Sequence, residues 1–361
     1  MAVTLKQIAE HLGVSQSLVS GVLNDRDGVW VSEENRRRII RAARELGYRP
    51  HAAARALASG KTHTIAFVFV GRRDLPYGRY FFEHPTGVIE VLADLLGRKG
   101  YDLLVRTYSP PAGGDIPPGA VAHPSTCDLA VVWGEERVVE QTVHALEADG
   151  IPFVAKGYHE ESHPHWPQVE FDHEAMMRAS VETVIAHGRT RLAYLGFDRD
   201  EAFAHRLIQG FSAATEQLLG TPPRPDFISS AGSTHDSTRE QVRRWLGLPE
   251  DQRPDGYIIG GGAAAWEGLE LTLAEDDVRL GPGRDQVSVA GQGNASDPML
   301  FGEGHAFHSV SLAELAREMG ERLLLPLLHA DDPDTPVLRF LPRLTPKRSW
   351  RLDPAPPRKT D

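Results

Sequence analysis

A single glycine, Gly13, separates two short segments near the start of the chain that each have the residue pattern of a helix. Thr4 and Gln7 have the spacing of a capping box, and apolar residues recur at helical intervals from Leu5 to Leu12. Beyond the glycine, Ser15 is a helix-capping residue type, and the segment after it is also amphipathic. This arrangement predicts two short helices joined by a tight turn.

A third helix is predicted from Ser32 to Leu46. Ser32 can cap it, acidic residues follow in the first turn, and Gly47 is placed to end it. Residues 1–48 therefore predict a compact three-helix domain.

The second predicted helix carries polar side chains opposite its apolar ones. In a helix-turn-helix, this helix lies in the major groove of DNA, where Gln can pair with adenine and Ser can bond to either type of base edge. Gln16, Ser17 and Ser20 meet that requirement, and arginines around the third helix suit phosphates. The alternative is a generic three-helix bundle with a solvated polar face.

Charge is distributed unevenly along the chain. Residues 1–63 hold ten Lys or Arg and six Asp or Glu, whereas the remainder holds 29 basic and 44 acidic residues. A basic head on an acidic body is expected when only the head meets a polyanion such as DNA.

Residues 49–61 follow as a short alanine-rich stretch after Pro50. Alanine favours a helix, but a helix this short is marginal alone and should need a partner. Leu57 is its one large apolar side chain, which suggests a hinge helix that orders against a dimer mate and inserts Leu57 into the minor groove. An exposed linker with an incidental leucine is the alternative.

The segments VTLKQIAEHLGVSQSLVSGVLN and VSEENRRRIIRAARELGYRPHAAARALASGKT resemble the DNA-binding head and hinge of the lactose-repressor (LacI/GalR) family. The resemblance implies a cytoplasmic homodimer or tetramer that binds operator DNA as a repressor. Gly21 stands where the family has arginine, so the family's operator sequence does not carry over. The resemblance assigns base reading to Gln16 and Ser17 and hinge insertion to Leu57. It assigns phosphate or groove support to Thr4, Ser15, Ser20, Asn24, Tyr48 and Ala54.

From Thr64 onward, apolar β-rich segments alternate with helical segments in two successive series. This alternation predicts an α/β body of two lobes, each a parallel sheet covered on both faces. Open sheets of this kind bind ligands beyond the carboxyl ends of their strands. We therefore expect an effector site there.

Residues 62–350 also resemble this family and, through it, the periplasmic sugar-binding fold. The resemblance implies an effector-binding and dimerisation domain with a first lobe at about 62–171 and 308–333 and a second at about 172–307 and 334–350, followed by a disordered tail at 351–361. AHRLIQGF places Arg206 where the family has an effector-contacting arginine. The chain is then expected to cross between lobes near 172, 308 and 333.

Sugar sites combine aromatic faces with planar polar groups. Several charged or polar residues that the family has in its effector site are replaced in this chain, by Tyr158, Gly262, Ala263 and Gly293. The identity of the family's effector therefore does not carry over. For each aromatic candidate, ordinary packing is the alternative. The candidates at or after strand ends are Tyr80, Phe81, Phe82, Tyr158, Asp172, Arg206, Trp266, Gln292 and Asn294.

The stretch YHEESHPHW contains His159, Glu160, His163 and His165. Although two of these histidines have i, i+4 spacing, the prolines favour a loop and no cysteine ligand is near, so solvated loop histidines and no metal are expected.

No catalytic constellation is present in the sequence, so an enzyme is not expected, and no cofactor is implied. No membrane span or secretory signal is apparent, and the single Cys127 is predicted to be a buried, inert thiol. Besides an effector-controlled regulator, two functions stay open: a DNA-binding regulator without a sugar effector, and a stand-alone sugar-binding module.

Overall fold

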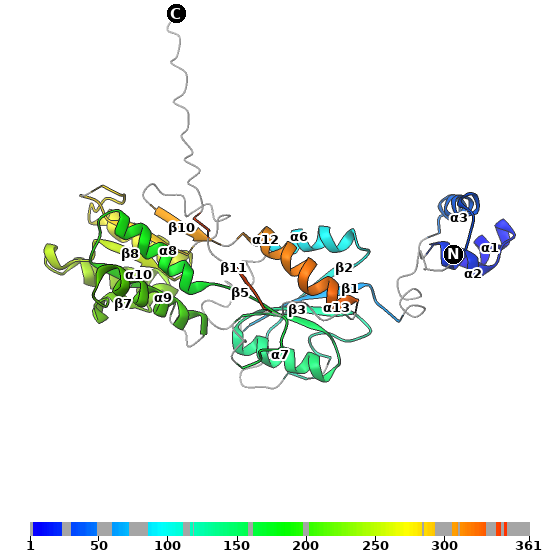
Figure 1. Cartoon of the computed structure of the whole chain (residues 1–361), viewed down its shortest axis with the longest axis horizontal. Coiled ribbons are helices and arrows are strands. Elements are labelled where there is room, and N and C mark those ends of the chain that lie inside the picture. The colour runs from blue at the N-terminus through cyan, green and yellow to red at the C-terminus, as the bar shows by residue number, and fades with distance from the viewer. Residues whose placement is uncertain are drawn as a thin grey trace, which may run out of the picture. The chain divides into compact units, whose positions relative to one another are not determined.

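A computed structural model of the chain describes residues 3–23, 30–48, 60–71, 86–110, 116–117, 119–157, 162–197, 202–283, 285–292, 305–309, 311–329, 337–340 and 343–344. They belong to two compact units (Figure 1). One comprises residues 1–64 with 125–128, and the other comprises 65–124 with 129–361.

The first unit begins with three helices: α1 (Leu5–Leu12), α2 (Gln16–Leu23) and α3 (Glu33–Glu45). The predicted capping box of α1 is present, and Gly13 ends that helix at φ 67° in the left-handed region. Ser32 caps α3 by accepting a hydrogen bond from the backbone N–H of Asn35. The helices pack around a small core of Ile8, Ala9, Val19, Val22, Ile39, Ala42 and Ala43.

The second unit contains two six-stranded sheets. The first has the order β11-β5-β4-β3-β1-β2, with parallel pairing from β11 through β1. Its strands are β1 (Thr64–Val70), β2 (Asp102–Tyr108), β3 (Leu129–Gly134), β4 (Phe153–Lys156), β5 (Gln168–Phe171) and β11 (Val337–Phe340). Its helices are α6 (Thr86–Gly97), α7 (Glu136–Ala148), α12 (Leu312–Met319) and α13 (Leu325–Leu328), the last two joined by a π-helical turn at Gly320–Leu324.

Helices cover both faces of this sheet, with α6 and α12 on one side and α7 on the other (Figure 1). Alternate residues of β1 and β3, such as Phe67 and Val131, pack against α6 and α12 in one core. Because each strand is buried on both faces, its sequence is almost continuously apolar. This explains why β1 and β3 were recognisable as short apolar runs.

The second sheet has the order β12-β10-β9-β8-β6-β7 and is parallel except for the edge pair of β10 and β12. Helices α8 and α9 contribute to the core on one face, and α10 and α11 to the core on the other. The strands are β6 (Leu192–Leu195), β7 (Ile228–Ser229), β8 (Gly256–Ile259), β9 (Ser288–Gln292), β10 (His305–Ser309) and β12 (Arg343–Leu344), and the helices are α8 (His173–Ala186), α9 (Ala202–Leu219), α10 (His235–Leu246) and α11 (Ala263–Glu275). Short 3-10 turns lie at Pro225–Phe227, Ala231–Ser233 and Glu250–Gln252.

The chain passes between the sheets three times. It leaves the first sheet after β5 and returns after β10, close to the crossings expected near 172 and 308. The third expectation is wrong: β11 pairs in parallel with β5 and buries Leu338 in the first core, so residues 337–340 belong to the first lobe. The last crossing lies between Phe340 and Arg343, not near 333.

Cys127 is buried, as predicted. Within the described residues, no helix has the length and apolar character needed to cross a membrane. The tail at 351–361 lies outside the described residues.

Candidate DNA-binding and effector sites

Helix α2 has a buried face and an exposed polar one. Val19 and Val22 enter the head core, whereas Gln16 and Ser17 are exposed. Ser15 is also exposed, and its Oγ accepts a hydrogen bond from the Leu18 N–H at 3.2 Å, which caps the helix start. The packing of Val19 and Val22 therefore leaves the polar side chains at the amino end of α2 exposed to solvent.

Two other DNA-contact candidates of the head, Thr4 and Tyr48, contact neighbouring residues of the head. Thr4 donates its N–H to Gln7 Oε1 at 2.8 Å, and its Oγ1 accepts from the Gln7 N–H at 3.3 Å, so it sets the start of α1. Ser20 is half-buried on α2. Tyr48 packs against the head core, and this burial raises the pKa of its phenol. Asn24, Ala54 and Leu57 lie outside the described residues.

Helix α3 supplies exposed cationic groups. Arg37 and Arg38 are both exposed, and each is oriented by its own helix. The Arg37 Nε donates to the Glu33 carbonyl at 3.2 Å, and an Arg38 guanidinium nitrogen donates to Asn35 Oδ1 at 3.2 Å. Guanidinium groups held in this way are suited to phosphate contacts.

In the body, aromatic and charged side chains gather where strands of the first sheet end. The ammonium of Lys156 lies 6.0 Å from the centroid of the Trp133 ring and 5.4 Å from that of Phe171. These two rings meet edge to face at 6.4 Å. We call Trp133, Lys156, Phe171, His173 and Phe203 the strand-end cluster.

His173 extends this cluster toward the second lobe. Its ring lies 6.0 Å from Phe171 and 5.7 Å from Phe203. Burial, together with the nearby charge of Lys156, lowers the pKa of His173 to about 3, although a backbone hydrogen bond at Phe171 opposes the shift. His173 is therefore neutral at physiological pH.

Asp172 and Arg206 lie beside this cluster. Asp172 Oδ1 caps α8 by accepting from the Ala175 N–H at 2.8 Å. Arg206, on α9, pairs with Glu174 at 3.3 Å. Since Glu174 is half exposed, this ion pair contributes little to stability.

Gln292 and Trp266 form a separate group at the strand ends of the second sheet. The Gln292 side-chain amide donates to the Gly260 carbonyl, and the Gln292 carbonyl accepts from Trp266 Nε1 at 2.9 Å. Trp266 is completely buried in the core between the sheet and α11. Its indole therefore packs in the core and positions the end of β9. For Trp266 the structure thus favours ordinary packing, the alternative to a role in the effector site.

The remaining effector candidates, Tyr80, Phe81, Phe82, Tyr158 and Asn294, lie outside the described residues. Sequence reasoning overlooked Trp133, Lys156, Phe171 and His173. A signal was available for two of them, because Trp133 and Lys156 end the apolar segments DLAVVW and PFVAK, and ligands of α/β sheets bind beyond strand ends.

One hydrogen bond joins the lobes near this cluster. Glu136 Oε2, at the start of α7, accepts from the backbone N–H of Ala202, the first residue of α9, at 2.7 Å. A carboxylate at a helix amino terminus is favourable because of the helix dipole. The contact therefore links the first lobe to the second.

Together, the capped helix pair with its exposed polar face and the two-lobed α/β body define a helix-turn-helix transcription regulator. The model of "Bacterial regulatory proteins, lacI family" matches residues 4–51. The transcriptional regulator AglR of Rhizobium meliloti is 30% identical over 250 residues, covering 69% of this chain and 67% of AglR. Catabolite control protein A of Priestia megaterium is 25% identical over 266 residues, covering 72% of this chain and 74% of that protein.

Solved structures agree on the fold. The lac repressor dimer bound to operator and the anti-inducer ONPF has a TM-score of 0.71 at 18% identity, covering 95% of this chain and 98% of that one. A complex of the regulator CelR with cellobiose has a TM-score of 0.59 at 20% identity, with the same coverage. The chain belongs to the LacI family of bacterial DNA-binding transcription regulators. The expected fold class is confirmed.

Proposed function

We propose that this regulator binds a palindromic operator as a homodimer and represses transcription until a small-molecule effector, a sugar or sugar derivative, changes its affinity for DNA. The observation that carries the proposal is the orientation of α2, which exposes Gln16 and Ser17 over a buried apolar face. In this proposal, residues 1–48 are the DNA-binding head, residues 49–61 are the hinge, and the protein acts in the cytoplasm, where its operator lies.

The division of labour within the head follows from side-chain chemistry. Gln16 can form a bidentate pair with adenine, and Ser17 can bond to either type of base edge. Arg37 and Arg38 are exposed, and contacts from them to phosphates would orient α2 without reading sequence. Thr4, Ser15, Ser20, Asn24, Tyr48 and Ala54 would support this placement, and Leu57 of the hinge would enter the minor groove.

The proposal includes a homodimer because one α2 helix would contact only a short half-site of the operator. Two heads related by a two-fold axis read two half-sites, and the operator then acquires the same symmetry. The lac repressor structure that shares this fold is a dimer on its operator. For the present chain, dimerisation is part of what we propose.

For the effector, we propose a site at the strand-end cluster, completed by Asp172 and Arg206. Phe171 offers a partly exposed aromatic ring beside the buried Trp133, while Lys156 and Arg206 offer donors to hydroxyl or acidic groups. An effector shifts DNA affinity only if it binds the two lobe arrangements unequally. The Glu136–Ala202 contact between lobes is one interaction that such a shift would strengthen or break.

Selection of bound DNA from a random-sequence pool tests the DNA-binding part. Purified full-length protein is expected to enrich a two-fold symmetric site. Enrichment of no site, or only of a site without symmetry, would contradict the proposed dimeric operator complex.

A panel of neutral sugars, sugar acids and sugar phosphates tests the effector part. The true effector is expected to raise the melting temperature and to alter binding to the selected operator, and Arg206→Ala should weaken both effects. A matched control is Arg178→Ala, since Arg178 also pairs with a glutamate, Glu182, but neither residue belongs to the cluster. If no compound acts, the chain is a DNA-binding regulator without a sugar effector.

A further inference from the structure

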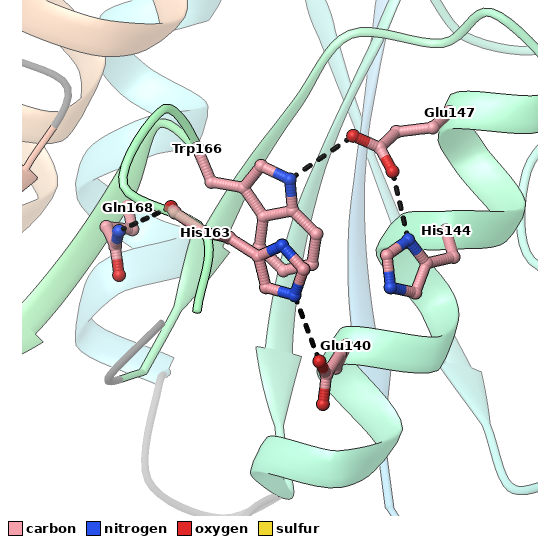
Figure 2. A network of polar contacts seen from close by, with 6 residues as sticks. All are labelled: Glu140, His144, Glu147, His163, Trp166 and Gln168. Carbon is pink, nitrogen blue, oxygen red and sulfur yellow. Dashed lines mark hydrogen bonds and ion pairs between the residues drawn. The ribbon is translucent and has the colours of Figure 1, made fainter. Parts of the chain in front are cut away.

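Three potential metal ligands converge on the flank of the first lobe, and none of them belongs to the strand-end cluster. Glu140 and His144 are one turn apart on α7, and His163 comes from the connection between β4 and β5. Their ligand atoms all lie within 4.8 Å of one another. Figure 2 shows these side chains directed toward a common point.

The expectation of a solvated loop histidine is wrong for His163. Its ring stacks on Trp166 with centroids 3.8 Å apart and planes inclined by 5°, and only 18% of its side chain is exposed. Trp166 is itself completely buried. His165 is exposed, as expected, and His159 and Glu160 lie outside the described residues.

The backbone beneath His163 is also held in place. Its carbonyl accepts hydrogen bonds from the Trp166 N–H at 3.1 Å and from the Gln168 side-chain amide at 3.5 Å. Gln168 is fully buried at the start of β5. Stacking and these bonds therefore preorganise the imidazole, so little conformational entropy would be lost when it binds a ligand.

His144 is oriented by a second carboxylate. Its Nδ1 lies 3.0 Å from Glu147 Oε2, and the other oxygen of Glu147 accepts from Trp166 Nε1 at 3.2 Å. The bond to Glu147 places the proton on Nδ1 and leaves Nε2 as the basic nitrogen. Figure 2 shows that nitrogen on the side of the ring facing His163 and Glu140. A carboxylate on the outer nitrogen of a ligating histidine is the usual support in metal sites.

The spacing suits a small transition ion. Zn²⁺ binds imidazole nitrogen and carboxylate oxygen at about 2.0–2.2 Å, which separates two ligand atoms by about 3.4 Å in a tetrahedron. His163 Nε2 and Glu140 Oε1 are 3.0 Å apart, and both His144 and Glu140 are exposed enough to adjust. Two nitrogens and one oxygen leave a fourth position for water.

We propose that Glu140, His144 and His163 form a binding site for one divalent transition-metal ion, of which Zn²⁺ is the reference case, with Glu147 as a positioning residue. The ion connects α7 to the β4–β5 connection within the first lobe. The site is independent of DNA and effector binding, so its failure would leave the proposed function untouched.

The test uses the full-length chain without a histidine tag, stripped of metal with a chelator. Calorimetric titration with ZnCl₂ is expected to give one ion per chain, and titration with Co²⁺ is expected to give the visible absorption of a four-coordinate site. Zn²⁺ should also raise the melting temperature, since it binds the folded state preferentially.

Variants then assign the ligands. His144→Ala and His163→Ala are each expected to weaken Zn²⁺ binding at least ten-fold. His144 is more than half exposed, so its loss should spare the fold, and melting without metal checks this. Glu147→Gln should keep the Co²⁺ spectrum while weakening binding about ten-fold. The matched control is His165→Ala, an exposed histidine of the same connection, which should bind normally.

Three results would overturn the proposal: no stoichiometric Zn²⁺ binding, unchanged affinity in both His144→Ala and His163→Ala, or an equal loss in His165→Ala. In each of these cases the cluster is a hydrogen-bonded network that holds the connection against α7 without an ion.

Discussion

The head and the body place the side chains of their proposed sites in different ways. In the head, Gln16 and Ser17 face outward from one helix, whose opposite face packs into a core formed within residues 3–48. In the body, the strand-end cluster brings together Trp133, Lys156, His173 and Phe203 from four separate elements. The proposed DNA contacts therefore depend on the small core of the head, whereas the proposed effector site depends on packing between distant segments of the body.

The substitution Val19→Asp is expected to have the largest effect and to affect the head without affecting the body. Val19 is fully buried in the head core, and an unpaired buried charge costs several kcal/mol, so the small head should unfold. Operator affinity should fall at least about 100-fold, equivalent to about 3 kcal/mol, in a gel-shift titration. The melting transition of the body should not move.

A matched valine checks that the effect is due to burial. Val105 on β2 is 46% exposed, so Val105→Asp should leave both DNA binding and melting nearly unchanged. Operator binding that survives Val19→Asp would show that the head does not depend on this core.

The converse experiment destabilises the body. Glu170 is completely buried and pairs with Arg339 of β11, so Arg339→Ala should remove a charged partner from a buried carboxylate. We expect a loss of about 3 kcal/mol in the free energy of unfolding, measured by urea denaturation.

Arg98→Ala is the control for that variant, because Arg98 and Asp94 form an exposed pair on α6. Such pairs contribute at most about 1 kcal/mol. Equal effects of the two substitutions would contradict the position of β11 in the first sheet.

Acid should affect the body through its buried histidines. Burial lowers the pKa of His308 to about 4, and its Nε2 lies 3.3 Å from Thr183 Oγ1. Between pH 6.5 and 4 the unfolded chain binds more protons than the folded one, so stability falls as the pH falls through this range. The loss from this group should be on the order of 2–3 kcal/mol by pH 4.

Unfolding of wild type and His308→Gln across this pH range measures that contribution. The variant should show a flatter pH dependence, whatever its absolute stability. Parallel pH profiles would mean that His308 does not couple protonation to folding.

The smallest expected effect concerns Arg37 of the head. If its exposed guanidinium contacts phosphate, Arg37→Ala should weaken binding to all DNA sequences similarly and lower the salt slope by about 1. Titrations at several salt concentrations with operator and non-operator DNA measure this. A loss confined to the operator would instead make Arg37 a base-reading residue.

The difference between the two regions also explains how far the sequence alone could predict them. Thr4, Gly13 and Ser32 determine helix ends through contacts with residues at most three or four positions away, and the structure contains each of these caps. The apolar runs of β1 and β3 were equally visible, because strands buried on both faces carry few polar residues.

Features that depend on distant pairing were not visible in the same way. β11 joins the first sheet because Leu338 pairs with Val169, and no local pattern encodes that choice. Prolines correctly indicated a loop around His163, but its burial requires Trp166 and helix α7 together. Trp266 has the residue type of a sugar-stacking aromatic, yet its position on α11 directs it into the core.

The proposed function depends on the exposed face of α2 reading DNA sequence. The most direct test is to select sites from one random pool with wild type and Gln16→Ala in parallel. We predict that the variant selects the same symmetric site but loses preference at one base position per half-site, by about 1–3 kcal/mol of discrimination. An unchanged base preference, or a uniform loss of affinity at every position, would contradict the account.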